Sequence, residues 1–229
     1  MWARALTAAA AAWCAPAAAP VVPPLAAVFR LPLRVADGIA ITFDDGPHPE
    51  GTPAVLDVLQ RAGVHATFFL VGEQVERNPA LAAEIVAAGH EVALHGHRHT
   101  LMLRRTPAEM REDCARAANA VGEATGLAPT LYRPPYGVFS LAGLALVRRR
   151  GWQPFLWSRW GRDWERAATP TSIARTASRG LANGDVVLLH DADDYSSEGS
   201  WRRTAAALPD VLEAALATGD PLVTLSHSR

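Results

Sequence analysis

The sequence predicts an α/β fold in which a single domain forms a distorted (β/α) barrel with about seven parallel strands. Two observations predict this fold. Apolar runs of strand length alternate with segments of helical periodicity from Gly38 onward. Candidate polar residues follow the ends of several of these runs, and they converge on one site only if the strands surround a common axis. An open, doubly wound sheet would account for the first observation alone.

Seven apolar runs have the length of a buried strand: 39–43, 66–71, 91–95, 129–132, 152–157, 186–190 and 222–225. Six other segments have helical patterns: 52–62, 79–88, 107–125, 140–150, 171–180 and 201–218. Several of these helices begin with Thr-Pro or Asn-Pro and end at Gly, the residues preferred at the first helical position and just past the last. Because helices separate the strands, we expect right-handed crossovers and a parallel sheet.

Composition limits the class of protein. The 229 residues are 49% hydrophobic and 20% charged, which suffices for one core, and we expect a monomer. The formal net charge of -1 offers no electrostatic basis for a nucleic-acid partner, and we expect none. Cys14 and Cys114 lie far apart in dissimilar surroundings and form no Cys-x-x-Cys motif. The sequence therefore indicates neither a disulfide framework nor a thiolate metal site.

Residues 1–37 are expected to form an Ala/Pro-rich leader, and residues 38–229 the catalytic domain. No charged residue occurs from Ala5 to Phe29, and residues 8–12 form a weakly apolar stretch typical of a signal peptide or membrane tether. Prolines in the leader would break a membrane-spanning helix early, so the alternative is a loosely packed leader on a cytoplasmic protein. We favour an extracytoplasmic or membrane-tethered location, with any membrane contact confined to the leader.

The segment Thr-Phe-Asp-Asp-Gly-Pro-His-Pro places Asp44 and Asp45 at the exit of the first strand. The residues that follow force a sharp turn, so the two carboxylates diverge and can take different roles. One can hold a cation while the other stays free as a base. The alternative interpretation is a pair of aspartates that cap the turn.

His95 and His99 are four positions apart, so a helical turn after the third strand would place both imidazoles on one face. That arrangement can bind one metal ion. Arg133 precedes Pro-Pro-Tyr-Gly, a rigid segment that can fix its guanidinium and the backbone N–H of Tyr136. A guanidinium keeps a neighbouring carboxylate ionised, and a fixed N–H can stabilise an oxyanion. Alone, this segment would be a stiff loop.

His190 ends a Val-Val-Leu-Leu strand, where an imidazole is suited to proton delivery because its pKa lies near neutrality. Asp163 can orient or tune that histidine, and Trp164 can provide an apolar wall beside it. An Arg-Asp-Trp loop with a purely structural role is the alternative.

In this order, the segments at Asp44, His95, Arg133, Asp163 and His190 resemble the motifs of the polysaccharide deacetylase family, also called carbohydrate esterase family four. The resemblance runs from about Gly38 to Leu225. It implies a distorted (β/α) barrel with one divalent metal ion, with zinc favoured and cobalt the alternative. The implied metal ligands are Asp45, His95 and His99. The implied roles of the others are Asp44 as catalytic base, Arg133 as its support, Tyr136 as oxyanion donor through its N–H, His190 as general acid tuned by Asp163, and Leu188 with Trp164 as the acetyl pocket.

Two positions depart from the family's pattern. Gly96 stands where the family usually has Ser or Thr, which removes a hydroxyl close to the metal ligands, and Trp160 stands where a further Asp is often found. Neither change removes a metal ligand or a proposed acid or base. Trp157, Trp160 and Trp164 are suited to stacking on sugar faces, although Trp157 can equally pack in the core.

The expected activity is hydrolysis of N-acetyl groups on acetamido sugars of a polysaccharide or oligosaccharide, such as peptidoglycan, a chitin-type polymer or a capsule, with release of acetate. One alternative is an O-acetyl esterase that acts on an acetylated polysaccharide. The other is an inactive carbohydrate-binding barrel, against which the intact set of acids and histidines argues.

Overall fold

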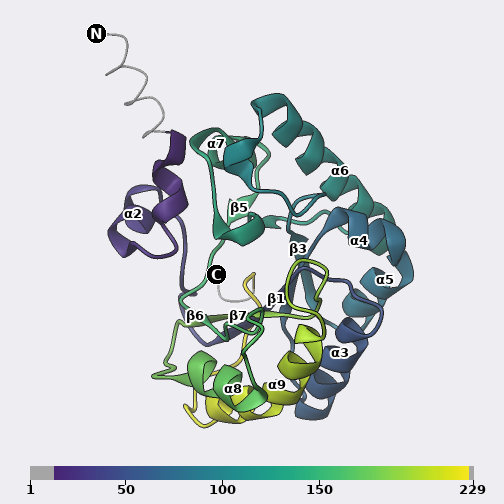
Figure 1. Cartoon of the computed structure of the whole chain (residues 1–229), viewed down its shortest axis with the longest axis vertical. Coiled ribbons are helices and arrows are strands. Elements are labelled where there is room, and N and C mark those ends of the chain that lie inside the picture. The colour runs from purple at the N-terminus through teal and green to yellow at the C-terminus, as the bar shows by residue number, and fades with distance from the viewer. Residues whose placement is uncertain (1–12, 227–229) are drawn as a thin grey trace.

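A computed structural model describes residues 13–226 of the chain. One parallel sheet of seven strands has the order β5-β4-β3-β2-β1-β7-β6 and curls so that helices surround it on the outside (Figure 1). The strands are β1 (Ala40–Asp44), β2 (Thr67–Leu70), β3 (Glu91–Leu94), β4 (Leu131–Tyr132), β5 (Gln153–Pro154), β6 (Arg159–Trp160) and β7 (Val186–His190). Strands β5 and β6 form the two edges of this sheet, so the barrel is distorted, and the predicted fold class is confirmed.

The register of the central strands decides where the polar residues lie. In β1, Asp44 pairs with Phe69 of β2 on one side and with His190 of β7 on the other. His95 directly follows β3, whose Leu94 pairs with Leu70 of β2. The carboxyl ends of β1, β2, β3 and β7 therefore meet at one end of the barrel, as parallel strands require.

Two predicted strands differ from the structure. The run 152–157 contributes only β5, after which the chain crosses to the opposite edge and forms β6 beside β7. The run 222–225 makes a single bridge between Leu222 and Ile39. β7 pairs with β1 from Ala40 and β2 pairs with it from Thr42, so the last segment reaches the chain only at Ile39, before β1 begins.

The helices around the sheet are α3 (Gly51–Ala62), α4 (Gly72–Arg77), α5 (Pro79–Ala87), α6 (Pro107–Thr125), α7 (Leu141–Arg149), α8 (Pro170–Ser178) and α9 (Ser200–Leu216). All six predicted helices are present, and α4 is an addition. Thr106 and Thr169 cap α6 and α8 with capping boxes, each followed by Pro at the first position. Gly63 and Gly126 end α3 and α6 in the left-handed conformation that favours glycine.

The described part of the leader packs against the barrel. It contains a short 3₁₀ helix η1 (Ala15–Ala18) and helix α2 (Pro23–Val28), which lies beside α7 and β5 (Figure 1). The Leu156 N–H donates to Pro32 O at 2.9 Å, between the two edge strands, and Leu31 is buried. The apolar stretch 8–12 lies outside the described residues. Within the described range, no helix combines the length and the apolar character needed to cross a membrane.

Candidate active site

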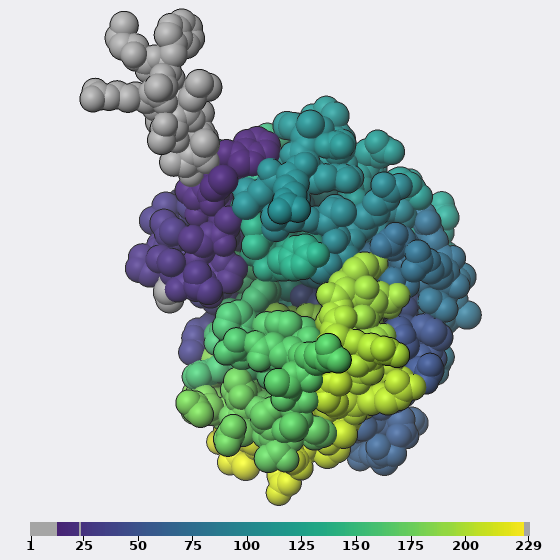
Figure 2. Space-filling view, in the orientation of Figure 1, coloured from purple at the N-terminus to yellow at the C-terminus, as the bar shows by residue number. Residues whose placement is uncertain are grey.

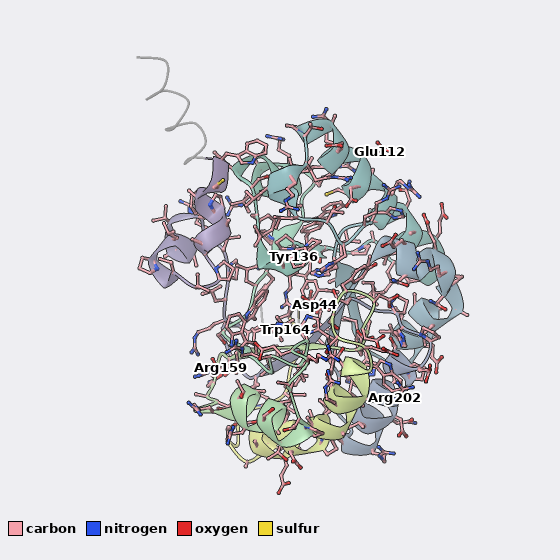
Figure 3. All side chains as sticks on the ribbon, viewed as in Figure 1. Asp44, Glu112, Tyr136, Arg159, Trp164 and Arg202 are labelled. Atoms are coloured by element: carbon pink, nitrogen blue, oxygen red, sulfur yellow. The ribbon has the colours of Figure 1, made fainter. Side chains whose placement is uncertain are left out.

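Eight of the ten predicted site residues line one pocket of about 250 Å³ at the carboxyl ends of the strands. They are Asp44, Asp45, His95, His99, Tyr136, Trp164, Leu188 and His190. Figure 2 shows a hollow on the viewed face, and Figure 3 shows Tyr136 and Trp164 on opposite sides of Asp44. The remaining two residues, Arg133 and Asp163, are fully buried and contact pocket residues from behind.

Asp44 is held by the buried guanidinium of Arg133. The Arg133 Nη1 donates to Asp44 Oδ1 at 2.6 Å and to Thr42 Oγ1 at 2.9 Å, both on β1. The Nη2 donates to Leu156 O at 2.8 Å, and the guanidinium lies 3.9 Å from the ring centre of Phe69. Burial lowers the pKa of Arg133, and Asp44 opposes this effect. The pair is thus a buried, hydrogen-bonded ion pair that fixes the position of the Asp44 carboxylate.

Asp45, His95 and His99 form a compact group of ligand atoms. Their donor atoms lie within 4.8 Å of one another, with Asp45 Oδ1 at 3.4 Å from His95 Nε2 and 3.2 Å from His99 Nε2. Burial raises the pKa of Asp45, but the contact with His95 and the charge of His190 outweigh it and lower this pKa to about 2. Burial lowers the pKa of His99 to about 4, so His99 is neutral at pH 7. The group therefore offers one anion and the neutral imidazole of His99.

The hydrogen bonds around this group fit a bound cation. His95 Nδ1 lies 2.9 Å from the carbonyl oxygen of Arg133, which can only accept, so Nδ1 carries a hydrogen and the other ring nitrogen, Nε2, is directed towards Asp45. A carboxylate oxygen and an imidazole nitrogen then face each other at 3.4 Å. Asp45 Oδ1 is also buried without a hydrogen-bond partner among the described residues. A divalent metal ion would satisfy both groups, and its coordination by one Asp and two His is common for zinc.

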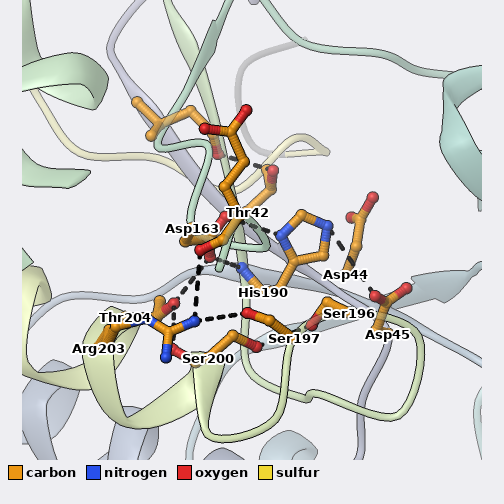
Figure 4. Close-up of polar contacts among 12 residues, drawn as sticks. Thr42, Asp44, Asp45, Asp163, His190, Ser196, Ser197, Ser200, Arg203 and Thr204 are labelled. Carbon is orange, nitrogen blue, oxygen red and sulfur yellow. Dashed lines mark hydrogen bonds and ion pairs between the residues drawn. The ribbon is translucent and has the colours of Figure 1, made fainter. Parts of the chain in front are cut away.

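His190 is anchored by Asp163 from the β6–α8 connection (Figure 4). Asp163 Oδ1 lies 3.0 Å from His190 Nδ1, and Oδ2 accepts from the His190 backbone N–H at 2.7 Å and from Thr204 Oγ1 at 2.8 Å. Burial lowers the pKa of His190, but the adjacent Asp163 outweighs burial and raises it to about 10. Nε2 faces the pocket, 4.0 Å from Asp45 Oδ2. A cation bound at Asp45 would lower the His190 pKa again.

The pocket walls are aromatic. The Trp160 ring centre lies 6.0 Å from that of Trp157 and 5.8 Å from that of Trp164, whose ring meets His190 edge-on at 5.4 Å. Trp157 is 8% exposed, so it packs in the core and also lines the pocket. On the other side Tyr136 has a φ of 61° and a half-exposed ring that meets His99 edge-on at 4.5 Å.

Gly96, one of the two departures from the family pattern, has a φ of 80°, in the left-handed region. A Cβ at this position would lie 3.1 Å from Asp113 Oδ2, which accepts the N–H of His97 at 2.8 Å. Glycine therefore suits both the conformation and the space of this turn.

Several residues of the site were not predicted from the sequence. Tyr195, from the β7–α9 loop, stacks on His99 with ring centres 4.3 Å apart and donates its hydroxyl to Glu73 Oε1 at 2.6 Å. Asp191 is buried against the turn at Gly46 and accepts a hydrogen bond from Thr52. Burial raises the pKa of Asp191 to about 7. Thr42, which accepts a hydrogen bond from Arg133, could have been predicted as a site residue from its place in β1. Tyr195 lies in a loop, and nothing in the sequence around it indicates that it contacts His99.

The polysaccharide deacetylase family model matches residues 35–155. The chain belongs to the polysaccharide deacetylase family. This deacetylase domain is 36% identical over 191 residues to a peptidoglycan-N-acetylglucosamine deacetylase of Bacillus cereus, covering 82% of this chain and 86% of the relative. It is 39% identical over 163 residues to a chitooligosaccharide deacetylase of a Bradyrhizobium species, covering 71% and 74%. The solved structure of a peptidoglycan N-acetylglucosamine deacetylase bound to a benzamide compound superposes with a TM-score of 0.82 at 26% identity, covering 89% and 95%.

Proposed function

We propose that this protein hydrolyses the N-acetyl group of an acetamido sugar within a polysaccharide or oligosaccharide and releases acetate. The observation that carries the proposal is the meeting of three units around one pocket. The same space is faced by the proposed metal ligands Asp45, His95 and His99. It is also faced by Asp44, which the buried Arg133 holds, and by His190, which Asp163 holds. The family membership and the named activities of the relatives support this reaction class.

Asp45, His95 and His99 would hold one divalent metal ion, with zinc favoured for this set of nitrogen and oxygen donors and cobalt as the alternative. When bound, such a metal polarises a carbonyl oxygen and lowers the pKa of water.

Asp44 is the proposed general base. Its Oδ1 is occupied by Arg133, while Oδ2 lies 3.7 Å from His95 Nε2, beside the ligand set. Arg133 holds the carboxylate through Oδ1, so Oδ2 is the oxygen placed to accept a proton from an attacking water molecule. Arg133 acts through Asp44 and is a positioning residue.

His190 is the proposed general acid. Asp163 occupies its Nδ1, so the proton to be transferred resides on Nε2, which faces the pocket. That proton goes to the nitrogen of the departing amino sugar, a leaving group that must be protonated as the C–N bond breaks. Leu188 and Trp164 form the apolar pocket for the acetyl methyl group, and the backbone N–H of Tyr136 supports the developing oxyanion.

The relatives named above act on peptidoglycan or chitooligosaccharides, and we infer a substrate of this kind for the present chain. A cell-wall substrate favours an extracytoplasmic or membrane-tethered location, with residues 1–37 as the leader and 38–229 as the catalytic domain. We infer a monomer.

Metal analysis combined with acetate release tests the proposal. The purified protein should retain one divalent ion per chain and release acetate from acetylated chitooligosaccharides faster than from acetylated xylan. His95→Ala should lose both metal and activity, because it removes one of the imidazole ligands. The matched control is His65→Ala, at an exposed histidine outside the pocket, which should keep both.

The other outcomes separate the alternatives. Preference for acetylated xylan would identify an O-acetyl esterase. Binding of chitooligosaccharide without acetate release from a metal-loaded protein would identify an inactive carbohydrate-binding barrel. A full equivalent of metal in His95→Ala after dialysis would overturn the ligand assignment.

A further inference from the structure

A second hollow, of about 480 Å³, adjoins the catalytic pocket and shares two of its walls, His99 and Tyr136. Its other lining residues come from the segment after His99, which contains the 3₁₀ helix η2 (Met102–Arg104). They are Thr100, Leu101, Arg104 and Arg105. The half-exposed ring of Tyr136 stands between the two hollows, so a polymer held with its acetamide in the catalytic pocket can continue over Tyr136 into the second.

The lining of this second hollow contains two guanidinium groups and no carboxylate. The exposed Arg104 makes no ion pair with any described residue. Arg105 Nη2 lies 3.8 Å from Asp113 Oδ1, but the Asp113 oxygens already accept the backbone N–H groups of His97 and Arg98 at 2.8 and 3.1 Å. Arg105 Nε is buried without a hydrogen-bond partner among the described residues. The hollow therefore has unused donors and excess positive charge.

One more acidic group lies close to Arg105. The carboxylate of Glu109 accepts the Thr106 N–H at 2.7 Å as part of the cap of α6, and the charge of Arg105 contributes to lowering its pKa. Glu109 does not line the hollow.

We propose that Arg104, with Arg105, binds a carboxylate on the unit of the glycan next to the acetamido sugar. Guanidinium groups bind carboxylates through paired, charge-assisted hydrogen bonds, and two of them beside the aromatic wall of Tyr136 select for an anionic neighbour. The subsite rests on the proposed function, because the same polymer must fill both hollows. It would make this enzyme prefer acetylated polymers that carry carboxylates over neutral chitin-type chains.

Such a carboxylate has two sources in peptidoglycan: the lactyl ether of the muramic acid ring, or the peptide attached to it. Four substrates of matched length separate them. They are a neutral acetylated chitooligosaccharide, a peptide-free peptidoglycan glycan, the same glycan with its carboxylates converted to amides, and a peptide-bearing glycan.

The variant that carries the test is Arg104→Gln, because Arg104 is exposed and makes no ion pair with the described part of the chain. We expect KM for the peptide-free glycan to rise about tenfold with kcat unchanged, as loss of a charge-assisted hydrogen bond predicts. KM for the neutral chitooligosaccharide and for the amidated glycan should change less than about twofold. Arg149→Gln, at an exposed arginine on α7 that lines neither hollow, is the matched control and should change no substrate's KM.

A rise in KM confined to the peptide-bearing glycan would support the subsite and assign the carboxylate to the peptide. Equal rises for neutral and anionic substrates would overturn it, as would a wild-type enzyme with the same KM for the amidated, the peptide-free and the peptide-bearing glycans. If no substrate releases acetate, the proposed function has failed, and calorimetric binding of the peptide-free and peptide-bearing glycans to wild type and Arg104→Gln still decides the subsite. Equal dissociation constants would then overturn it.

Discussion

The ion pair between Arg133 and Asp44 allows a quantitative test of what holds the proposed base in place. Arg133 is fully buried and donates to Asp44 Oδ1, Thr42 Oγ1 and the carbonyls of Phe155 and Leu156. Replacing it with Met fills most of the volume but leaves the Asp44 carboxylate buried without its cation. Replacing Asp44 with Asn instead leaves the guanidinium without its anion.

Breaking a buried ion pair by removing one partner costs about 3–5 kcal/mol, because the remaining charge is desolvated without compensation. We therefore expect Arg133→Met to lower the free energy of unfolding by about 4 kcal/mol. The double variant Arg133→Met with Asp44→Asn removes both charges, and it should be less destabilised than the sum of the single changes by about 2 kcal/mol. A domain of ordinary stability, about 5–15 kcal/mol, remains folded after such a loss.

Urea denaturation of the wild type, both single variants and the double variant gives the four free energies of the cycle, with tryptophan fluorescence as the signal. Arg61→Met is the control, since the Arg61–Asp57 pair on α3 is exposed and should be worth less than about 1 kcal/mol. A coupling energy near zero would refute the reasoning, because it would mean that Asp44 does not need Arg133 to remain charged in the folded protein.

Proton transfer, metal binding and acid stability can each be tested by single substitutions. His190→Ala should reduce acetamide hydrolysis by about a hundredfold or more, with metal content unchanged, while largely sparing an aryl acetate, whose leaving group needs no proton. Parallel losses on both substrates would make His190 a binding residue. Asp44→Asn should keep the metal and lose turnover, whereas Asp45→Asn should lose the metal, and equal metal loss after dialysis would contradict this division. Burial lowers the pKa of His90 from 6.5 to about 4, and its Nδ1 accepts the Ala66 N–H at 3.1 Å. The unfolded chain therefore binds more protons in this range, and stability should fall as the pH falls from 6.5 to 4 by up to about 3 kcal/mol from this group. His90→Asn keeps an acceptor that does not titrate and should flatten the dependence in urea denaturation, while an unchanged pH profile would exclude His90 as its source.

The parts of the site at strand ends could be predicted from the sequence. Asp44 and His190 each end an apolar run, and parallel pairing places such ends side by side, as the observed register of β1 and β7 does. His95 follows β3 for the same reason. The helical turn expected from the spacing of His95 and His99 is wrong: the segment is a bend in which Gly96 has a left-handed φ of 80°. Both imidazoles still lie near one carboxylate oxygen of Asp45.

The parts that depend on loops could not be predicted in the same way. Tyr195 reaches His99 from a polar loop with no periodicity, and Thr204 reaches Asp163 from a helix 41 residues later. The run 152–157 is equally apolar whether it pairs as one strand or crosses the open side of the barrel. That the run forms only β5 at one edge, and that β6 follows it at the opposite edge, depends on which strand each part meets, and only the tertiary structure decides that.

The two carboxylates of the pocket, Asp44 and Asp45, and the buried Asp163 behind it differ in how their charge is balanced, and this difference supports the proposed metal ligand. Asp44 is paired with Arg133 at 2.6 Å, and Asp163 is paired with His190 at 3.0 Å. Asp45 is as buried as Asp44 but has no permanent cation within 4 Å among the described residues, and His190, 4.0 Å away, is already engaged by Asp163. A buried anion with no dedicated partner is costly, which supports our proposal that a cation from outside the chain binds here. Of the three carboxylates, Asp45 is therefore the one we propose as the ligand of a divalent ion.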